Sequence, residues 1–275
     1  YNGDILLVYA VCGLFVLPFI RLSNKVLMGI ALFFMLQPIE LVYLVGGILN
    51  PELQPLNLGA NEAYSAIVPA QIDGSFGEVA WVSLKYGLLA NFQWAIENGR
   101  MTQTVFLFVM GIIIGRYRFL YDEGDNRILW KKMMIYSLLG FVVLYPMQEY
   151  IPSMIHNACV SHSLGIMLKM WMNLSMMFFY VSGITWLYHC TKGGKKLIWI
   201  APYGKMSLTN YLTQSIFGAM LFYGWGFGLY QYCGHTLSLL IGIAFVCLQY
   251  VFCRWWLKSH QRGPFEDLWR RATWI

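Results

Sequence analysis

The sequence predicts an all-α, polytopic helical membrane protein with about seven membrane-spanning helices. Two observations predict this class. Of 275 residues, 58% are hydrophobic and only 12% are charged, whereas soluble domains carry about a quarter charged residues. Apolar runs also recur at close to the ~20 residues that a helix needs to cross the hydrocarbon core. A soluble enzyme is therefore excluded. A disordered chain is excluded as well, because aromatic residues make up 17% of the sequence.

The expected spans follow one another from the first residues to the last quarter of the chain. They are Ile5–Ile20, Val26–Ile48, Thr102–Gly115, Met133–Met147, Ser163–Tyr188, Ser207–Tyr223 and Thr236–Leu257. The third and fourth are short and need flanking aromatic residues, such as Phe119 and Trp130, to reach both interfaces. Because no internal repeat is detectable, we expect a single transmembrane domain over residues 1–275.

Lys and Arg are distributed unevenly among the connections between these spans. Of the 19 cationic residues, 16 lie in alternate connections or in the tail after the last span. The other connections hold only Lys85 and Arg100, and Lys169 falls inside a span. Because cytoplasmic loops retain cations, this pattern predicts a cytoplasmic C-terminus and a start outside. The net charge of +6 then reflects topology and indicates no nucleic-acid partner, so the lipid bilayer is the expected partner.

The longest connection, residues 49–100, is expected on the outer side. Its first half contains Pro51, Pro55 and Pro69 and predicts a loop. Its second half is more apolar but carries charged and amide side chains, which favours a helix at the membrane interface over an eighth span. This segment would form an outer cap over the bundle.

Two ionisable side chains are expected inside spans, where each costs roughly 2.5–3.5 kcal/mol to insert and is a candidate for function. Glu40 follows Pro38, which frees a backbone carbonyl nearby and could open a polar pocket. Alternatively, the helix is kinked and Glu40 reaches the outer interface. Lys169 either extends to the interface or forms an ion pair in a site for an anionic or zwitterionic group. Its expected partners are Glu40, Asp4 and Glu149.

A polar stripe runs along the start of the expected sixth span. It consists of Ser207, Asn210, Tyr211 and Gln214. Positions spaced i, i+3, i+4 and i+7 share one helical face. In a membrane such a face must meet another helix or a water-filled cavity. The stripe therefore indicates either hydrogen bonds between helices or a path that binds a substrate.

His156 and His162 lie in an expected outer connection that contains no cation. A general base facing the outside is one interpretation of this pair, and solvated loop histidines are the other. The spacing is not that of a metal motif and no CxxC occurs, so no metal or other cofactor is predicted. Cys159 and Cys233 both fall in outer connections, where a disulfide could form in an oxidising compartment.

Four stretches of the sequence together resemble a known family. The most specific are Gly204–Ser215 (GKMSLTNYLTQS) and Arg262–Arg270 (RGPFEDLWR), supported by GDIL at Gly3–Leu6 and by Gly111–Arg116. These motifs resemble the YeiB-like family, domain of unknown function 418 (DUF418). The resemblance implies a multi-pass bacterial inner-membrane protein that is distantly similar to transmembrane acyltransferases, in a family also associated with transport.

Members of that family normally have further membrane helices before the GDIL motif. The sequence starts at Tyr1 with no initiator Met, so we expect it to be the C-terminal part of a longer protein. At the other end, Gly263-Pro264 ends the last span, and Phe265, Leu268 and Trp269 then share one helical face. This predicts a short interfacial helix within a cytoplasmic tail at 258–275, with an anchoring role.

Three functions are compatible with these residues. The first, implied by the resemblance, is transfer of an acyl group from a cytoplasmic donor to an extracytoplasmic acceptor, with Glu40, His156 and His162 as candidate catalytic residues. Candidate binding residues are Asp4, Lys169, Ser207, Asn210, Tyr211 and Gln214. The second is a transporter of a small polar metabolite that uses the same residues, and the third is a structural or partner-binding membrane subunit. The lack of matching halves favours the enzyme over the transporter.

Overall fold

The structure, a computed structural model, describes residues 5–121, 125–190 and 194–274. These residues form helices and connections with no strand among them, which confirms the all-α class. The chain divides into two compact units. The larger unit contains Asn2–Ala63 and Leu88–Gly194, and the smaller unit contains Tyr64–Gly87 and Lys195–Ile275. The expected single transmembrane domain stays a prediction.

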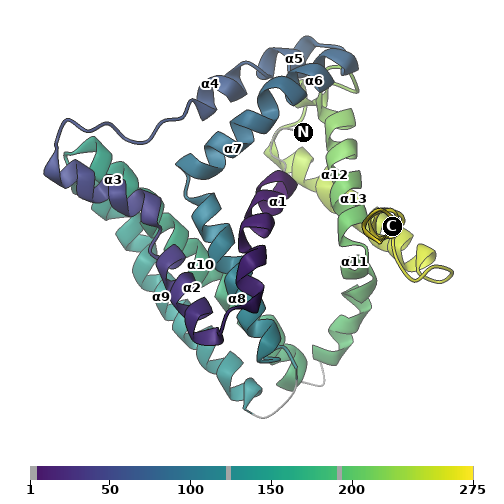
Figure 1. Ribbon diagram of the computed structural model, residues 1–275. Helices are drawn as coiled ribbons and strands as arrows, with labels where there is room; N and C mark the ends of the chain where they lie inside the picture. The colour runs from purple at the N-terminus through teal and green to yellow at the C-terminus, as the bar shows by residue number, and fades with distance from the viewer. Residues whose placement is uncertain (1–4, 122–124, 191–193, 275) are drawn as a thin grey trace. The chain divides into compact units, whose positions relative to one another are not determined.

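The larger unit is a bundle built around two long antiparallel helices. Its helices are α1 (Ile5–Val16), a 3-10 helix (Leu17–Arg21), α2 (Asn24–Met35), α3 (Pro38–Leu49), α7 (Leu88–Glu97), α8 (Arg100–Arg116), α9 (Asn126–Met154) and α10 (Ala158–Cys190). α9 lies along α10, α3 packs on α10, and α1 and α2 pack on α8 (Figure 1). The buried core joins side chains of α1, α2, α7, α8 and α10, with Leu27, Val109 and Ala95 fully buried.

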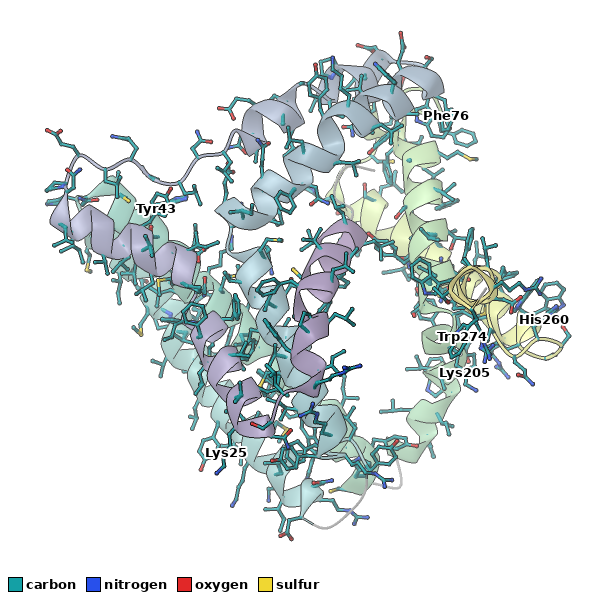
Figure 2. The ribbon with its side chains drawn as sticks, in the orientation of Figure 1. Lys25, Tyr43, Phe76, Lys205, His260 and Trp274 are labelled. Atoms are coloured by element: carbon teal, nitrogen blue, oxygen red, sulfur yellow. The ribbon has the colours of Figure 1, made fainter. Side chains whose placement is uncertain are left out.

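The smaller unit contains the second half of the outer segment and the C-terminal helices. Its helices are α5 (Val68–Asp73), α6 (Phe76–Val82), a π-helix (Ser83–Gly87), a 3-10 helix (Gly194–Ile200), α11 (Ala201–Lys205), α12 (Ser207–Phe222), a 3-10 helix (Leu229–Gln231), α13 (His235–Trp256) and α14 (Pro264–Thr273). The Gln71 carbonyl accepts a 2.9 Å hydrogen bond from the Gly224 amide. Phe76, labelled in Figure 2, meets the Trp225 ring edge-on with centroids 5.2 Å apart. These contacts hold α5 and α6 to the connection after α12.

The expectation of about seven spans is wrong in number. Three described helices, α9, α10 and α13, are long and apolar enough to cross a membrane, and α2 with α3 makes a fourth if that bent pair is one span. The remaining candidates are too short, because α1 has 12 residues, α12 has 16 and α8 has 17. At about 1.5 Å per residue, none of these α-helices reaches the ~30 Å of the hydrocarbon core by itself, and a crossing at any of them needs flanking residues. In the first expected span the apolar run continues through Leu17–Ile20, beyond the end of α1. The apolar run is therefore longer than the α-helix that it predicted.

Two of the predicted spans form helices that are longer than the apolar runs from which they were predicted. α9 has 29 residues and includes Pro146 and Pro152, and α10 has 33.

α13 exposes large apolar side chains along its length, among them Leu239, Ile243 and Val251. Exposed apolar surface of this extent is typical of helices that face lipid. The apolar helices therefore support a membrane protein.

The outer segment is more helical than the proline-rich sequence indicates. The expected loop contains the six-residue helices α4 (Ala60–Ser65) and α5, and the apolar half is helical in α6, the π-helix and α7. α6 begins with a capping box, in which Ser75 and Glu78 satisfy each other's backbone amides. The expected tail helix also forms as α14, where Asp267 and Arg271 make a 2.7 Å ion pair. Placement of these helices at a membrane interface stays a prediction.

Candidate functional site

A sharp break separates α2 from α3, and it positions the most deeply buried charged group described. Gln37 has a left-handed backbone (φ 53), and Pro38 is the first residue of α3. Proline disfavours a helical conformation in the residue before it, so α2 ends at Met35 and the chain continues as α3 from Pro38 after a 47° bend. The sequence analysis associated Pro38 with either a polar pocket or a kink, and the structure has a bend at this position.

The break turns two polar side chains into the larger unit. Gln37 and Glu40 are each only 3% exposed. The Gln37 Nε2 donates a 3.3 Å hydrogen bond to the Met167 carbonyl on α10. Among the described residues, neither oxygen of the Glu40 carboxyl group has a hydrogen-bond partner, and no donor bonds Gln37 Oε1. Glu40 therefore occupies a buried polar site and does not reach the surface.

Gly99, at the joint between α7 and α8, forms the opposite wall of this site. Its backbone is left-handed (φ +65), and a Cβ placed there would lie 2.9 Å from Gln37 Oε1 and 3.0 Å from Glu40 Oε1. Only glycine allows this close approach without strain. We call Gln37, Glu40 and Gly99 the Glu40 cluster. Its members come from sequence positions about sixty residues apart, and the sequence pattern did not bring Gly99 to attention.

The expected ion pair of Lys169 is absent from the described residues. Lys169 is exposed on α10, and no ion pair joins it to Glu40 or to Glu149. Asp4, its third expected partner, lies outside the described residues. The exposed position agrees with the interpretation that Lys169 extends from its helix toward polar surroundings.

His162 lines a polar cavity in the larger unit, which we call the His162 cavity. Its volume is about 620 Å³. The lining residues are Gln54, Pro55, Leu56, Asn57, Asn61, Trp94, Glu97, Asn98 and His162. Glu97 Oε1 accepts hydrogen bonds from the amides of Leu58 and Ala60, the latter at 3.3 Å, which ties this loop to α7. His156 is exposed in the connection between α9 and α10 and does not line the cavity.

The polar stripe of α12 contributes to a hydrogen-bonded network in the smaller unit. Gln249 of α13 lies at its centre, with its Nε2 donating to the Asn210 carbonyl at 3.0 Å and to Thr213 Oγ1 at 2.7 Å. Gln249 Oε1 accepts from Gln214 Nε2 at 2.9 Å and from Tyr203 Oη at 3.1 Å. We call these five residues the Gln249 network. Their mutual bonds favour the interpretation that the stripe joins helices.

The remaining two stripe residues lie outside this network. Ser207 is exposed at the first position of α12, and Tyr211 is half-buried.

Within the network, Asn210 has further partners. Its Nδ2 donates to the Tyr203 carbonyl at 3.0 Å, and its Oδ1 accepts from Cys253 Sγ at 3.3 Å. Sequence periodicity identified the face but not Gln249 or Tyr203, since each looks like an isolated polar residue in its own segment.

Two family-like motifs at Gly204–Ser215 and Arg262–Arg270 meet at the start of α12. Glu266 Oε1 accepts a 3.0 Å hydrogen bond from the Thr209 amide, and Glu266 Oε2 accepts from Thr209 Oγ1. A carboxylate in this place satisfies a free amide of the first helical turn and interacts favourably with the helix dipole. The two motifs therefore form one structural joint, which places α14 against α12.

The cysteines and possible metal ligands suggest no further centre. Cys159 and Cys233 are both free thiols, and Cys159 Sγ donates to the carbonyl of Tyr43, labelled in Figure 2, at 3.3 Å. Within the described ranges, no group of three His, Cys, Asp or Glu side chains is placed to hold a metal ion.

Comparison with known proteins places most of the chain in one family. A family model described as "Protein of unknown function (DUF418)" matches residues 114–275. The uncharacterized protein YxaH of Bacillus subtilis (strain 168) is 32% identical over 172 residues, which cover 62% of this chain and 39% of YxaH. The uncharacterized protein YeiB of Escherichia coli (strain K12) is 35% identical over 79 residues, which cover 29% of this chain and 20% of YeiB.

The chain thus spans less than half the length of the curated relatives it matches. No solved structure matches it. The region matched by the family model contains His162 and the Gln249 network, whereas the Glu40 cluster precedes it.

Proposed function

This chain belongs to the DUF418 family, as its motifs indicated, and from that premise we propose that it transfers an acyl group to a polar acceptor outside the cytoplasm. The proposal places the protein in the bacterial cytoplasmic membrane with its C-terminus in the cytoplasm, and it requires α8 and α12, each extended by flanking residues, to cross the membrane as well as α9, α10 and α13. Support for that orientation comes from the cations at the end of α13 and after it, which include Arg254, Lys258 and Arg262. Nothing in the family's description assigns an activity.

The observation that carries the proposal is the His162 cavity. A histidine and a carboxylate, Glu97, line one cavity together with amide side chains that can bind a polar acceptor. Histidine is the side chain best suited to proton transfer near neutral pH. The segments that build the cavity, 50–63, 94–98 and 155–162, contain no Lys or Arg, which supports an extracytoplasmic location.

In this proposal His162 acts as the general base. It takes the proton of the acceptor hydroxyl as the acceptor oxygen bonds to the acyl carbon. The bond between the acyl carbon and its carrier then breaks, and the carrier leaves with the electron pair. Asn57, Asn61 and Asn98 would orient the acceptor, since each lines the cavity with both donor and acceptor atoms.

A pair of histidine variants tests this role. His162→Ala should lower transfer of labelled acyl groups from a donor to an acceptor by about 10²–10⁴-fold in proteoliposomes. His156→Ala is the matched control, because His156 is exposed six residues earlier and does not line the cavity. Equal activity of the two variants would contradict a base at His162.

A second candidate function, transport of a small polar metabolite, is favoured by a different observation. Transporters commonly build binding sites from discontinuous helices, and the bent pair α2–α3 carries the buried Glu40 at its break. Labelled acyl donor separates the two functions. Label recovered as intact donor on the other side of the vesicle membrane supports transport, and label bonded to the acceptor supports acyl transfer.

A further inference from the structure

Buried oxygen atoms converge without a donor in the Glu40 cluster. Gln37 Oε1 and Glu40 Oε1 both lie within 3.0 Å of one point, the position of a Cβ on Gly99. Glu40 Oε2 is buried and unpartnered as well. A buried oxygen atom that finds no donor loses its hydration without replacement, which costs free energy. The cluster therefore lacks one hydrogen-bond donor.

The orientation of the Gln37 amide is set by α10. Its Nε2 donates to the Met167 carbonyl, so a flipped amide would lose that bond and turn two carbonyl oxygens toward each other. Gln37 Oε1 thus faces the Gly99 position as an acceptor, on the side where Glu40 Oε1 also lies. The missing donor has to come from Glu40 itself, from a water molecule or from another ligand.

The charged and titratable groups on the surrounding elements do not supply it. Arg100 Nη1 donates to Gln103 Oε1 at 3.1 Å, and Glu97 is bonded to the amides of Leu58 and Ala60. His162 and Lys169 on α10 are exposed. Cys159 on α10 donates to the Tyr43 carbonyl. None of these cations lies within 4.0 Å of a Glu40 oxygen, since no ion pair of Glu40 occurs among the described residues.

The space beside Gln37 is also too small for an organic ligand. The void lined by Gln37, Gln103 and Trp171, which Glu40 and Gly99 do not line, has a volume of about 10 Å³. It corresponds to one water at most, which could donate a hydrogen bond but would not remove the charge of a carboxylate. An unneutralised carboxylate in such surroundings would carry a desolvation cost of several kcal/mol. A proton on the carboxyl removes the charge and provides the missing donor in one step.

We propose that the Glu40 cluster is a proton-binding site. In its loaded form the Glu40 carboxyl is neutral and donates its O–H to Gln37 Oε1, and in its empty form the carboxylate requires that the α2–α3 break open to water. The ligand of this site is a proton exchanged with the aqueous phase. This inference goes beyond acyl transfer and does not depend on the His162 cavity.

Infrared spectroscopy of the intact protein in lipid vesicles tests the proposal directly. Spectra of the wild type and of Glu40→Gln are subtracted at neutral pH in sodium-free buffer. Glu149→Gln is the control, because Glu149 is exposed on α9. The Glu40 difference should contain the C=O stretch of a protonated carboxylic acid, sensitive to H₂O/D₂O exchange, and the Glu149 difference should contain only carboxylate bands.

Two results would overturn the proposal. Carboxylate bands in the Glu40 difference at neutral pH would show that the group is ionised at rest. Carboxylate bands that shift on addition of NaCl would show that a monovalent cation, not a proton, occupies the cluster.

A second variant keeps the test independent of Glu40 itself. Gln37→Asn tolerates the left-handed backbone but shortens the side chain that accepts the proposed hydrogen bond. The Glu40 C=O band should then shift in frequency while remaining present. An unshifted band would contradict the pairing of Glu40 with Gln37.

Discussion

The larger and smaller units each bury a group of polar side chains, but the two groups differ in how they are satisfied. In the Gln249 network every amide atom of Gln249 has a protein partner. In the Glu40 cluster three buried oxygens have none among the described residues. A satisfied network rigidifies helix packing, whereas an unsatisfied one calls for a water, an ion or a proton to complete it. The comparison therefore favours a structural role for the network and supports the proposal of a proton-binding site in the cluster.

The largest effect is expected from removing the centre of the Gln249 network. Gln249→Leu leaves Tyr203, Gln214 and Thr213 without their shared partner and should lower the free energy of unfolding by about 2–3 kcal/mol. Thermal unfolding in detergent measures the change. Gln231→Leu is the control, since Gln231 is exposed and bonds only its neighbour Tyr230. Equal melting temperatures of the two variants would remove the structural role of the network.

A substitution in the Glu40 cluster of the larger unit should have a much smaller effect on the free energy of unfolding. Glu40→Gln replaces a neutral carboxyl by an amide of nearly the same shape, and the free energy of unfolding should change by less than about 1 kcal/mol. A loss as large as that of Gln249→Leu would erase the contrast between the two groups.

Gly99→Ala tests how closely α7 and α8 approach the break. The substitution strains a left-handed backbone and places a methyl group against Gln37 and Glu40, so we expect a loss of about 1–2 kcal/mol in unfolding free energy. Gly111→Ala is the matched control in α8, where no atom lies within 4 Å of the added Cβ. That control should be neutral or stabilising by up to about 1 kcal/mol. The opposite order of the two variants would contradict the placement of Gly99.

A smaller effect is expected where the two family motifs meet. Glu266→Ala removes the acceptor for the Thr209 amide and should cost about 1 kcal/mol, as for the loss of other helix caps. Asp267→Ala removes only an exposed ion pair with Arg271 and should cost less than about 0.5 kcal/mol. Hydrogen exchange at the start of α12 distinguishes the two, because only Glu266→Ala should accelerate it.

The smallest effect concerns Glu78, an exposed carboxylate that has the donors Glu40 lacks. Hydrogen bonds from the Ser75 amide and hydroxyl lower the pKa of Glu78 from its ordinary value of 4.5. Because the pKa is lower in the folded state, the stabilisation is present above the ordinary value and is lost as pH falls through the lowered one. Hydrogen exchange of α6 should accelerate over that acidic range, and Ser75→Ala should reduce this pH dependence. A pH dependence unchanged in the variant would contradict the capping role.

Local patterns in the sequence were sufficient to predict much of the fold and some of the residues in each site. Low charge and long apolar runs predicted α9, α10 and α13, because hydrocarbon excludes charge and requires continuous helices. Pro38 indicated a local disturbance of the helix near Glu40, and helical periodicity placed Asn210 and Gln214 on one face. The number of spans was overestimated because hydropathy does not show where an apolar run leaves the α-helix, as it does after Val16.

The partners of these residues were decided by tertiary structure. Gly99 approaches Glu40, Gln249 bonds Gln214, and Glu266 caps Thr209, although each pair is separated by dozens of residues in sequence. Spacing along one helix shows which residues share a face, but not which side chain from another helix meets it. The sequence by itself thus determined a helical membrane protein with polar residues inside it. Only the packing decided that the α12 stripe is satisfied and that the oxygens around Glu40 are not, because satisfaction depends on atoms that distant segments bring together.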